Sequence, residues 1–205
     1  MPDGSSTPSV FINCPFDEAY RPLFEATVFA VAHCGFAPRC ALEIVDAAGT
    51  RIDKIMDLIG ECPLGIHDIS RTDPDPVSGL PRFNMPFELG LFLGARRFGN
   101  RRQKAKNCLI LDKERYRYQK FLSDIAGQDI DAHGSDPGKL ITRARNFLRT
   151  HSAGRTLPGG AVIKRDFARF ETRKPVICEA LELDFGELTF VDFAYLVAHY
   201  LNPAG

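Results

Sequence analysis

The sequence lacks several features that would place the chain in a particular functional class. Lys and Arg together number 26, and so do Asp and Glu, so the formal net charge is zero. A balanced charge creates no long-range field that attracts nucleic acid or an anionic membrane, so we expect neither partner. No apolar run approaches the roughly 20 residues needed to span a bilayer, and no signal-peptide pattern is visible. We therefore expect a cytoplasmic protein.

The six cysteines form no Cys-x-x-Cys pair and are scattered among apolar residues. Isolated thiols of this kind are typical of buried cysteines in a reducing compartment and do not indicate a disulfide framework. His33 and Cys34 are adjacent, and adjacent residues rarely converge on one ion, so we predict no metal site.

Glycine-rich nucleotide-binding and hydrolase motifs are also missing. There is no Gly-x-Gly-x-x-Gly or Walker loop, which argues against ordinary dinucleotide redox chemistry and ATP hydrolysis. There is no Gly-x-Ser-x-Gly elbow, which argues against an α/β-hydrolase. Any activity must therefore be inferred from individual residues and their predicted positions.

What the sequence does contain is an alternation of strand and helix patterns between residues 9 and 150. The predicted strands cover residues 9–13, 36–42, 64–70, 107–112 and 128–133. Predicted helices follow them at 20–34, 51–61, 85–95 and 113–125, and a last one runs to about residue 150. Gly35 is predicted to end the first of these helices, and Thr50 and Asp136 to cap the second and the last. Such alternation predicts a parallel sheet wrapped by helices on both faces, and continuously apolar strands indicate burial on both sides. The expected fold class is α/β, a flavodoxin-like or Rossmann-like three-layer sandwich with about five parallel strands.

Three segments are predicted along the chain. Residues 1–8 are polar and are expected to be disordered, and residues 9–150 form the α/β domain. Residues 151–205 form a C-terminal helical extension that begins with a linker bearing Gly, Pro and Ser. It contains two amphipathic stretches, 161–171 and 188–201, and the second is predicted to pack on the core, with a dimer or partner surface as the alternative.

Polar residues follow several of the predicted strands. Asn13, Pro15 and Phe16 lie at the end of the first strand, Asp68, Ser70 and Arg71 at the end of the third, and Asp112 at the end of the fourth. In such sheets, ligands bind beyond the carboxyl ends of the strands. We therefore expect these residues to converge on a binding site, beside the helix that begins near residue 84.

Within the apolar run 85–95 the only charged residue is Glu88. A helix that is apolar on all sides is buried, and a carboxylate in it must be neutralised, paired or directed into a polar cavity. Asn84 is predicted as the N-cap, and Pro86 falls in the first turn, where its missing N–H costs nothing. Glu88 is therefore interpreted as a working carboxylate, and the alternative is a first-turn acid that offsets the helix dipole.

A single carboxylate with polar neighbours suits the cleavage of an N-glycosidic bond. The sugar passes through an oxocarbenium-like state, which a carboxylate stabilises or captures covalently. Apolar surroundings strengthen that interaction because they exclude water. Phe16, Phe83 and Phe87 are candidates for stacking on a base, although we expect Phe87 in the core.

The same residues carry a family resemblance. The turn Asn-Cys-Pro-Phe at 13–16 resembles the turn after the first strand of nucleoside 2-deoxyribosyltransferases. Asp-Ile-Ser-Arg at 68–71, followed by Asn-x-x-Phe-Glu-Leu-Gly at 84–90, resembles a signature that those enzymes share with bacterial TIR-like nucleotide-binding proteins. The resemblance covers about residues 10–112, half the chain.

The resemblance implies that Glu88 is catalytic, acting at C1′ of a ribose, and that Asp68 helps to hold the ligand. The residues that would position ribose or phosphate are Ser70, Arg71 and Asn84. Where the transferases usually carry Gly-Thr before the Phe-Glu pair, this chain has Met85 and Pro86, which weakens a deoxyribosyl-transfer interpretation.

Bacterial TIR-like relatives often cleave NAD and release nicotinamide, many in anti-phage or toxin systems and some only after assembling. The resemblance therefore implies NAD or a related nucleotide as substrate, no separate cofactor, and a homo-oligomer. Two alternatives have other functions: a module that senses a nucleotide without cleaving it, and a scaffold that only self-associates.

Two basic clusters lie outside the predicted site. The cations between residues 96 and 106 are Arg96, Arg97, Arg101, Arg102, Lys104 and Lys106. They are predicted to form a solvated turn that complements a helix C-terminus, and the alternative is a contact with phosphate or nucleic acid. Residues 115–120 interleave basic and aromatic side chains and are predicted to form an exposed helix face. His67 is expected in the core.

Overall fold

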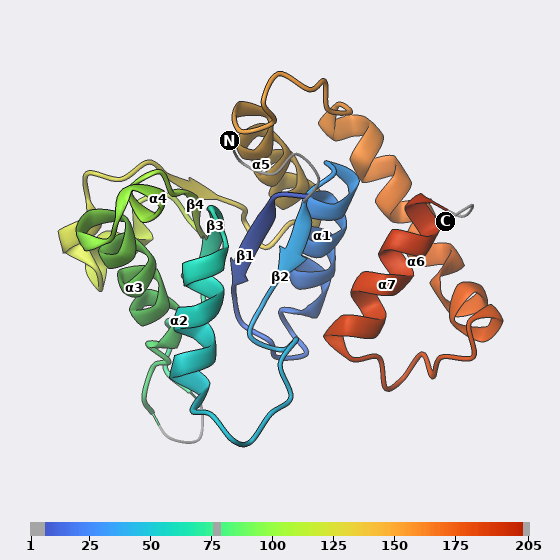
Figure 1. The fold of residues 1–205 in the computed structure, drawn as a ribbon, viewed down its shortest axis with the longest axis horizontal. Coiled ribbons are helices and arrows are strands. Elements are labelled where there is room, and N and C mark those ends of the chain that lie inside the picture. The colour runs from blue at the N-terminus through green and yellow to red at the C-terminus, as the bar shows by residue number, and fades with distance from the viewer. Residues whose placement is uncertain (1–6, 76–78, 203–205) are drawn as a thin grey trace.

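Five strands form a single parallel sheet in the computed structural model, which describes residues 7–75 and 79–202 (Figure 1). They are β1 (Ser9–Asn13), β2 (Ala37–Arg39), β3 (Leu64–Asp68), β4 (Asn107–Asp112) and β5 (Ile130–Ala132). All neighbouring pairs are parallel. The predicted α/β sandwich of about five parallel strands is therefore confirmed. Of the segment predicted to be disordered, residues 1–6 lie outside the described part of the chain.

The strands lie in the order β2-β1-β3-β4-β5. In a sheet of this order, the connections that follow β1 and β3 leave toward opposite faces, which opens a crevice at the carboxyl ends of these two strands. In the register of the sheet, Asn13 lies beside His67, and Asp68 lies beside Leu111. The polar strand ends therefore lie along one edge of the sheet, as predicted.

Helices cover both faces of the sheet (Figure 1). One face carries α1 (Arg21–His33) and α5 (Pro137–Thr150), and the other carries α2 (Arg51–Glu61) and α3 (Asn84–Phe98). A helix of four residues, α4 (Arg101–Lys104), follows α3. The three layers of the predicted sandwich are therefore present.

Local sequence signals account for several helix ends. The side chains of Thr50 and Asp136 each accept a hydrogen bond from the backbone N–H three residues further on, which caps α2 and α5. Gly35, with a φ of +74°, follows the end of α1 in the left-handed conformation that glycine tolerates best. These three predicted boundaries are confirmed.

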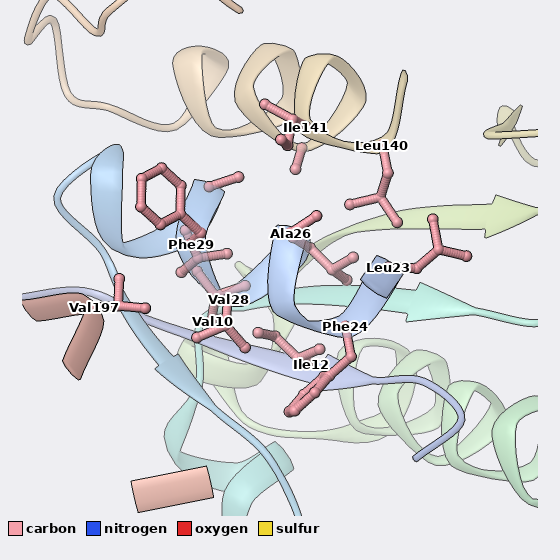
Figure 2. Close-up of a cluster of buried hydrophobic side chains, with 14 of the residues drawn as sticks. Val10, Ile12, Leu23, Phe24, Ala26, Val28, Phe29, Leu140, Ile141 and Val197 are labelled. Carbon is pink, nitrogen blue, oxygen red and sulfur yellow. The ribbon is translucent and has the colours of Figure 1, made fainter. Parts of the chain in front are cut away.

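The C-terminal helices α6 (Gly160–Ala180) and α7 (Phe190–Leu201) pack against α1 and share its core (Figure 1). The ring of Phe29 in α1 lies 5.3 Å from the rings of Phe167 and Phe170 in α6. Figure 2 shows part of this core, and Val197 of α7 belongs to the same buried cluster as Val10 of β1. Packing of the extension on the core is therefore confirmed.

Helix α6 is longer than predicted. It continues past residue 171 and through Pro175 to Ala180. Proline removes one backbone hydrogen bond from a helix, but Ile177 and Cys178 beyond it are buried against the rest of the core. Tertiary packing therefore outweighs the local signal for a helix end.

The helix predicted at residues 113–125 is absent, and two short 3₁₀ helices take its place, η1 (Arg117–Lys120) and η2 (Ser123–Ile125). Tyr118 is only 3% exposed, and Arg117 turns inward toward Asp112. The predicted exposed face is therefore wrong for these two side chains, because each is held by a partner in the sheet edge or the core.

All six cysteines are free, and five of them are buried. Within residues 7–75 and 79–202, no group of three or more His, Cys, Asp or Glu side chains is placed to hold a metal ion. No helix in the described chain is long and apolar enough to cross a membrane.

Candidate functional site

Asn13, at the end of β1, ties the start of α3 to the sheet. Its Nδ2 donates to the carbonyl oxygen of Met85 at 3.0 Å and lies 3.1 Å from Nδ1 of His67. Because an amide nitrogen only donates, Nδ1 of His67 is the acceptor, and the imidazole carries its proton on Nε2. Burial lowers the pKa of His67 to about 3, so the ring is neutral. Its expected place in the core is confirmed.

The start of α3 differs from the prediction. Asn84 is exposed and is already the first helical residue, and Phe83 occupies the N-cap position without a side-chain hydrogen bond. The predicted N-cap is therefore wrong. The anchor is instead the bond from Asn13 to Met85, which comes from a strand far away in the sequence.

Helix α3 is buried along one side only. Glu88, Leu89 and Phe92 are its buried residues, whereas Phe83 and Phe87 are 56% and 57% exposed. The predictions of an all-round buried helix and of Phe87 in the core are therefore wrong. The reason is that the first turns of α3 extend past the edge of the sheet, where nothing described covers their outer face. Two exposed aromatic rings consequently precede Glu88 in the sequence.

Glu88 is a buried carboxylate for which the described part of the chain supplies no partner. Its residue is 6% exposed, and no hydrogen bond or ion pair to it is present within residues 7–75 and 79–202. Burial raises the pKa of Glu88 to about 7, and Arg51 at the start of α2 opposes this shift. The first turn of α3 contains no acid, and Glu88 lies beyond it. The dipole-offsetting alternative therefore does not apply.

Asp68, at the end of β3, is held by three groups. Its carboxylate accepts hydrogen bonds from Tyr20 Oη at 2.5 Å and from the backbone N–H of Ser70 at 2.8 Å. Nε2 of His133 lies 3.0 Å from the same oxygen that Tyr20 contacts. Nδ1 of His133 accepts the N–H of Ser135, which turns Nε2 toward Asp68. Asp68 therefore joins the end of β3 to the start of α1 and to the residue that follows β5.

Asp112, at the end of β4, is fully buried and paired with Arg117. The Nε of Arg117 donates to Asp112 Oδ1 at 3.0 Å, and another guanidinium nitrogen donates to the carbonyl oxygen of Ser70 at 2.5 Å. Burial raises the pKa of Asp112, and Arg117 opposes that shift. This pair clamps the end of β4 to the loop that follows β3.

Two cavities open at this edge. One of about 300 Å³ is lined by Asp17, Arg71 and Arg82 among others, and the guanidinium of Arg71 lies 2.9 Å from Asp17. A second of about 180 Å³ is lined by Tyr20, His133 and their neighbours. Glu88 lines neither of the two cavities.

The structure brings together some of the predicted site residues and separates others. Asn13, Asp68, Ser70 and Asp112 gather as buried groups along the edge of the sheet, whereas Arg71, Phe83 and Asn84 are exposed. Pro15 is buried, and the ring of Phe16 packs edge-on against Phe24 at 5.4 Å. Glu88 lies near the turn after β1. This follows from the Cys14 thiol in that turn, whose pKa is raised by the charges of both Asp68 and Glu88.

The comparisons leave the family open. The chain matches no protein-family model, no curated protein and no solved structure.

Sequence reasoning missed Tyr20, Arg117 and His133, which hold the two aspartates. The available signal was position, since each residue lies where the chain leaves or approaches the carboxyl edge of the sheet. Taken together, the edge offers one buried carboxylate without a partner among the described residues, two buried carboxylates that are held by partners, and exposed arginine and phenylalanine side chains nearby. Such a set can stabilise a cationic carbon beside an aromatic group.

Proposed function

We propose that the protein cleaves the N-glycosidic bond of a nucleotide, with NAD or a related pyridinium nucleotide as substrate and Glu88 acting at C1′ of the ribose. The observation that carries this proposal is the carboxylate of Glu88. It is buried, has no partner among the described residues, and lies close to the crevice between β1 and β3. A carboxylate in such surroundings interacts strongly with positive charge.

The reaction needs one carboxylate and water. As the bond between C1′ and the pyridinium nitrogen breaks, its electron pair returns to the nitrogen, and nicotinamide leaves as a neutral molecule. The positive charge passes to the ribose, where the Glu88 carboxylate stabilises it or forms a covalent ester. Water then adds through its oxygen to C1′, and where an ester has formed its bond from C1′ to the Glu88 oxygen breaks, with the electron pair returning to the carboxylate. The proton of the water passes to the carboxylate, which releases it to solvent. The products are nicotinamide, ADP-ribose and one proton.

The held aspartates favour a pyridinium leaving group. An ordinary purine must be protonated as it leaves, which requires a second acid. Asp68 and Asp112, the other buried carboxylates at this edge, are engaged by Tyr20 and Arg117. A pyridinium ring needs no proton, and its positive charge lowers the pKa of a nearby carboxylate, so Glu88 would be ionised in the complex. The same argument weighs against deoxyribosyl transfer between purines.

The test measures free nicotinamide after incubation of the full chain with NAD, at low protein concentration and under crowding that promotes self-association. The wild-type chain is expected to release nicotinamide, and Glu88→Gln to reduce the rate by at least a hundredfold, which corresponds to about 3 kcal/mol of transition-state stabilisation. Glu179→Gln, at an exposed position on α6, is the matched control and keeps the wild-type rate. Full activity in Glu88→Gln overturns the proposal.

An NAD-consuming activity fits the anti-phage or toxin effectors that the sequence resembles. Expression of the wild-type chain in bacteria is then expected to slow growth and lower cellular NAD, and Glu88→Gln is expected to relieve both effects. Unchanged NAD during a growth defect contradicts this role.

A nucleotide-sensing module is the second candidate. It is favoured by one observation, namely that Glu88 lines neither cavity at the edge of the sheet. A module of this kind would raise its melting temperature with NAD, because a ligand that binds only the folded state stabilises it. It would release no nicotinamide. NAD would raise the melting temperature of Glu88→Gln by the same amount as that of the wild-type chain.

A further inference from the structure

A patch of exposed cations lies at the end of α3 and in α4. Its members are Arg96, Arg97, Arg101, Arg102 and Lys104, with the ring of Phe98 among them, and we call it the α3–α4 patch. No acidic residue occurs between positions 96 and 106. The patch lies at the far end of α3 from Glu88, because α3 begins at the carboxyl edge of the sheet and ends next to the start of β4 (Figure 1).

Lys106 does not belong to this patch. It is 2% exposed, and its ammonium group donates to the carbonyl oxygens of Ile59 and Cys62 at the end of α2 while it lies over the ring of Phe92. The prediction of a solvated turn is therefore wrong for Lys106. Lys106 satisfies carbonyl groups at the end of α2 from inside the protein, whereas its basic neighbours lie at the surface.

The cations of the α3–α4 patch have no acidic partners in the described chain. None of them forms an ion pair within residues 7–75 and 79–202. The guanidinium of Arg102 donates to the backbone carbonyl of Glu61, whose carboxylate lies 3.2 Å from Arg39 instead. Their positive charge therefore faces solvent uncompensated.

A favourable interaction between cations and the carbonyl groups at helix ends accounts for only some of the residues in the patch. Arg96 and Arg97 lie in the last turn of α3, where cations favourably face the unpaired carbonyl groups. Arg102 satisfies the carbonyl oxygen of Glu61 at the end of α2, whereas Arg101 and Lys104, on the single turn of α4, have no hydrogen-bond or ion-pair partner among the described side chains. Cations crowded within nine residues repel one another. A partner with negative charge would remove that penalty.

We propose that the α3–α4 patch binds the phosphate backbone of a nucleic acid and that Phe98 stacks on an unpaired base. Four of the five cations are arginines, whose forked guanidinium groups match phosphate oxygens. Phe98 is 86% exposed, and an exposed ring among cations is the pattern that binds single strands. An anionic membrane is the weaker fit, because only one large apolar side chain protrudes from the patch.

This inference revises what the net charge led us to expect. A formal net charge of zero describes the average over the chain. The local excess of five positive charges within nine residues acts at short range, where screening by salt is weakest. A binding surface for a polyanion is therefore compatible with a neutral protein.

The test measures the fluorescence anisotropy of a labelled oligonucleotide of about 20 nucleotides, used either as a single strand or as a duplex. The oligonucleotide is titrated with the full chain at about 50 and 200 mM salt. The patch variant carries Arg97→Gln, Arg101→Gln and Lys104→Gln. The control variant removes the same charge from scattered exposed positions, with Arg115→Gln, Lys120→Gln and Arg173→Gln. Matched melting temperatures of the three proteins show that the fold is intact.

We expect the wild-type and control proteins to bind the single strand, and the patch variant to bind it at least tenfold more weakly at low salt. Loss of three phosphate contacts is expected to lower the slope of log affinity against log salt by about two. Phe98→Ala is expected to weaken single-strand binding roughly tenfold and to leave duplex binding unchanged. Equal affinity of the patch and control variants overturns the proposal, and so does binding of anionic phospholipid vesicles without binding of either nucleic acid.

Discussion

At the scale of single residues, Glu88 makes folding depend on pH. A carboxylate that is buried without a partner costs free energy whenever it is ionised. Its ordinary pKa of 4.5 describes the unfolded chain, and burial raises the pKa to about 7 in the folded chain. Between these values the folded state holds a proton that the unfolded state has released, so the free energy of unfolding falls as pH rises. Above pH 7 the full penalty applies.

Glu88→Gln is therefore expected to stabilise the protein in alkaline solution. At about pH 8 the free energy of unfolding should rise by about 1–3 kcal/mol relative to the wild type, and the gain should shrink towards pH 5. Urea unfolding at both pH values measures this. Glu179→Gln, at an exposed position, controls for loss of charge alone. A difference between Glu88→Gln and the wild type that does not vary with pH contradicts the assigned burial penalty.

Single residues were predictable where the sequence places an unusual residue in a regular pattern. Glu88 was found because it is the only charge in an apolar run. Tyr20 was not, because its significance comes from Asp68, which lies 48 residues away. Lys106 resembles its basic neighbours in the sequence and differs only in the direction that its side chain takes after α4. Such directions follow from tertiary packing, which periodicity does not encode.

At the scale of elements, a buried ion cluster joins α6 to α1. The ammonium group of Lys174 lies 2.6 Å from the carboxylate of Glu25 and 3.1 Å from that of Glu171. Arg21 contacts Glu25 from the other side at 3.0 Å. The side chains of Lys174 and Glu25 are 6% and 8% exposed. Water therefore does little to stabilise the charge of one of them when the other is removed.

Lys174→Met is expected to lower the free energy of unfolding by roughly 3 kcal/mol, because Glu25 then keeps only Arg21 and Glu171 loses its cation. Adding Glu25→Gln to this variant is expected to recover part of the loss, since the uncompensated buried charge disappears. Chemical denaturation of the single and double variants measures both effects. Arg173→Met, an exposed neighbour on α6, should stay within about 0.5 kcal/mol of the wild type. A double variant less stable than Lys174→Met would exclude this account.

Elements were predictable where capping and periodicity agree. Thr50 and Asp136 marked helix starts correctly. The segment 113–125 was misjudged because its polar residues suit a helix surface, whereas Tyr118 and Arg117 are drawn into the core and the sheet edge. The amphipathic pattern ended at about residue 171, yet α6 continues through Pro175, because the buried residues beyond it keep the helix intact.

At the scale of the whole molecule, the predicted boundary at residue 150 crosses a continuous core. Residues of β1, α1 and α5 belong to the same buried cluster as residues of α6 and α7. The sequence showed that the C-terminal stretches are amphipathic but not which surface they cover, because amphipathicity identifies a face and not its partner. A shared core predicts that both parts unfold together.

Two buried cysteines report on the two parts of the molecule, Cys34 after α1 and Cys178 in α6. In a urea series with brief thiol labelling, both are expected to become reactive at the same urea concentration, while the half-buried Cys108 serves as a local reference. A chain ending at residue 150 is expected to lack a cooperative melting transition in circular dichroism. A separate, earlier exposure of Cys178 indicates an extension that detaches on its own.

Helix α3 has 15 residues and is therefore about 22 Å long. Glu88 sits near its beginning and the five surface cations gather at and beyond its other end. A polymer that occupies one end consequently leaves the other accessible, so oligonucleotide and dinucleotide should saturate the protein independently of each other. If one ligand inhibited binding of the other, the effect would have to be transmitted through helix α3, because the two ligands do not overlap.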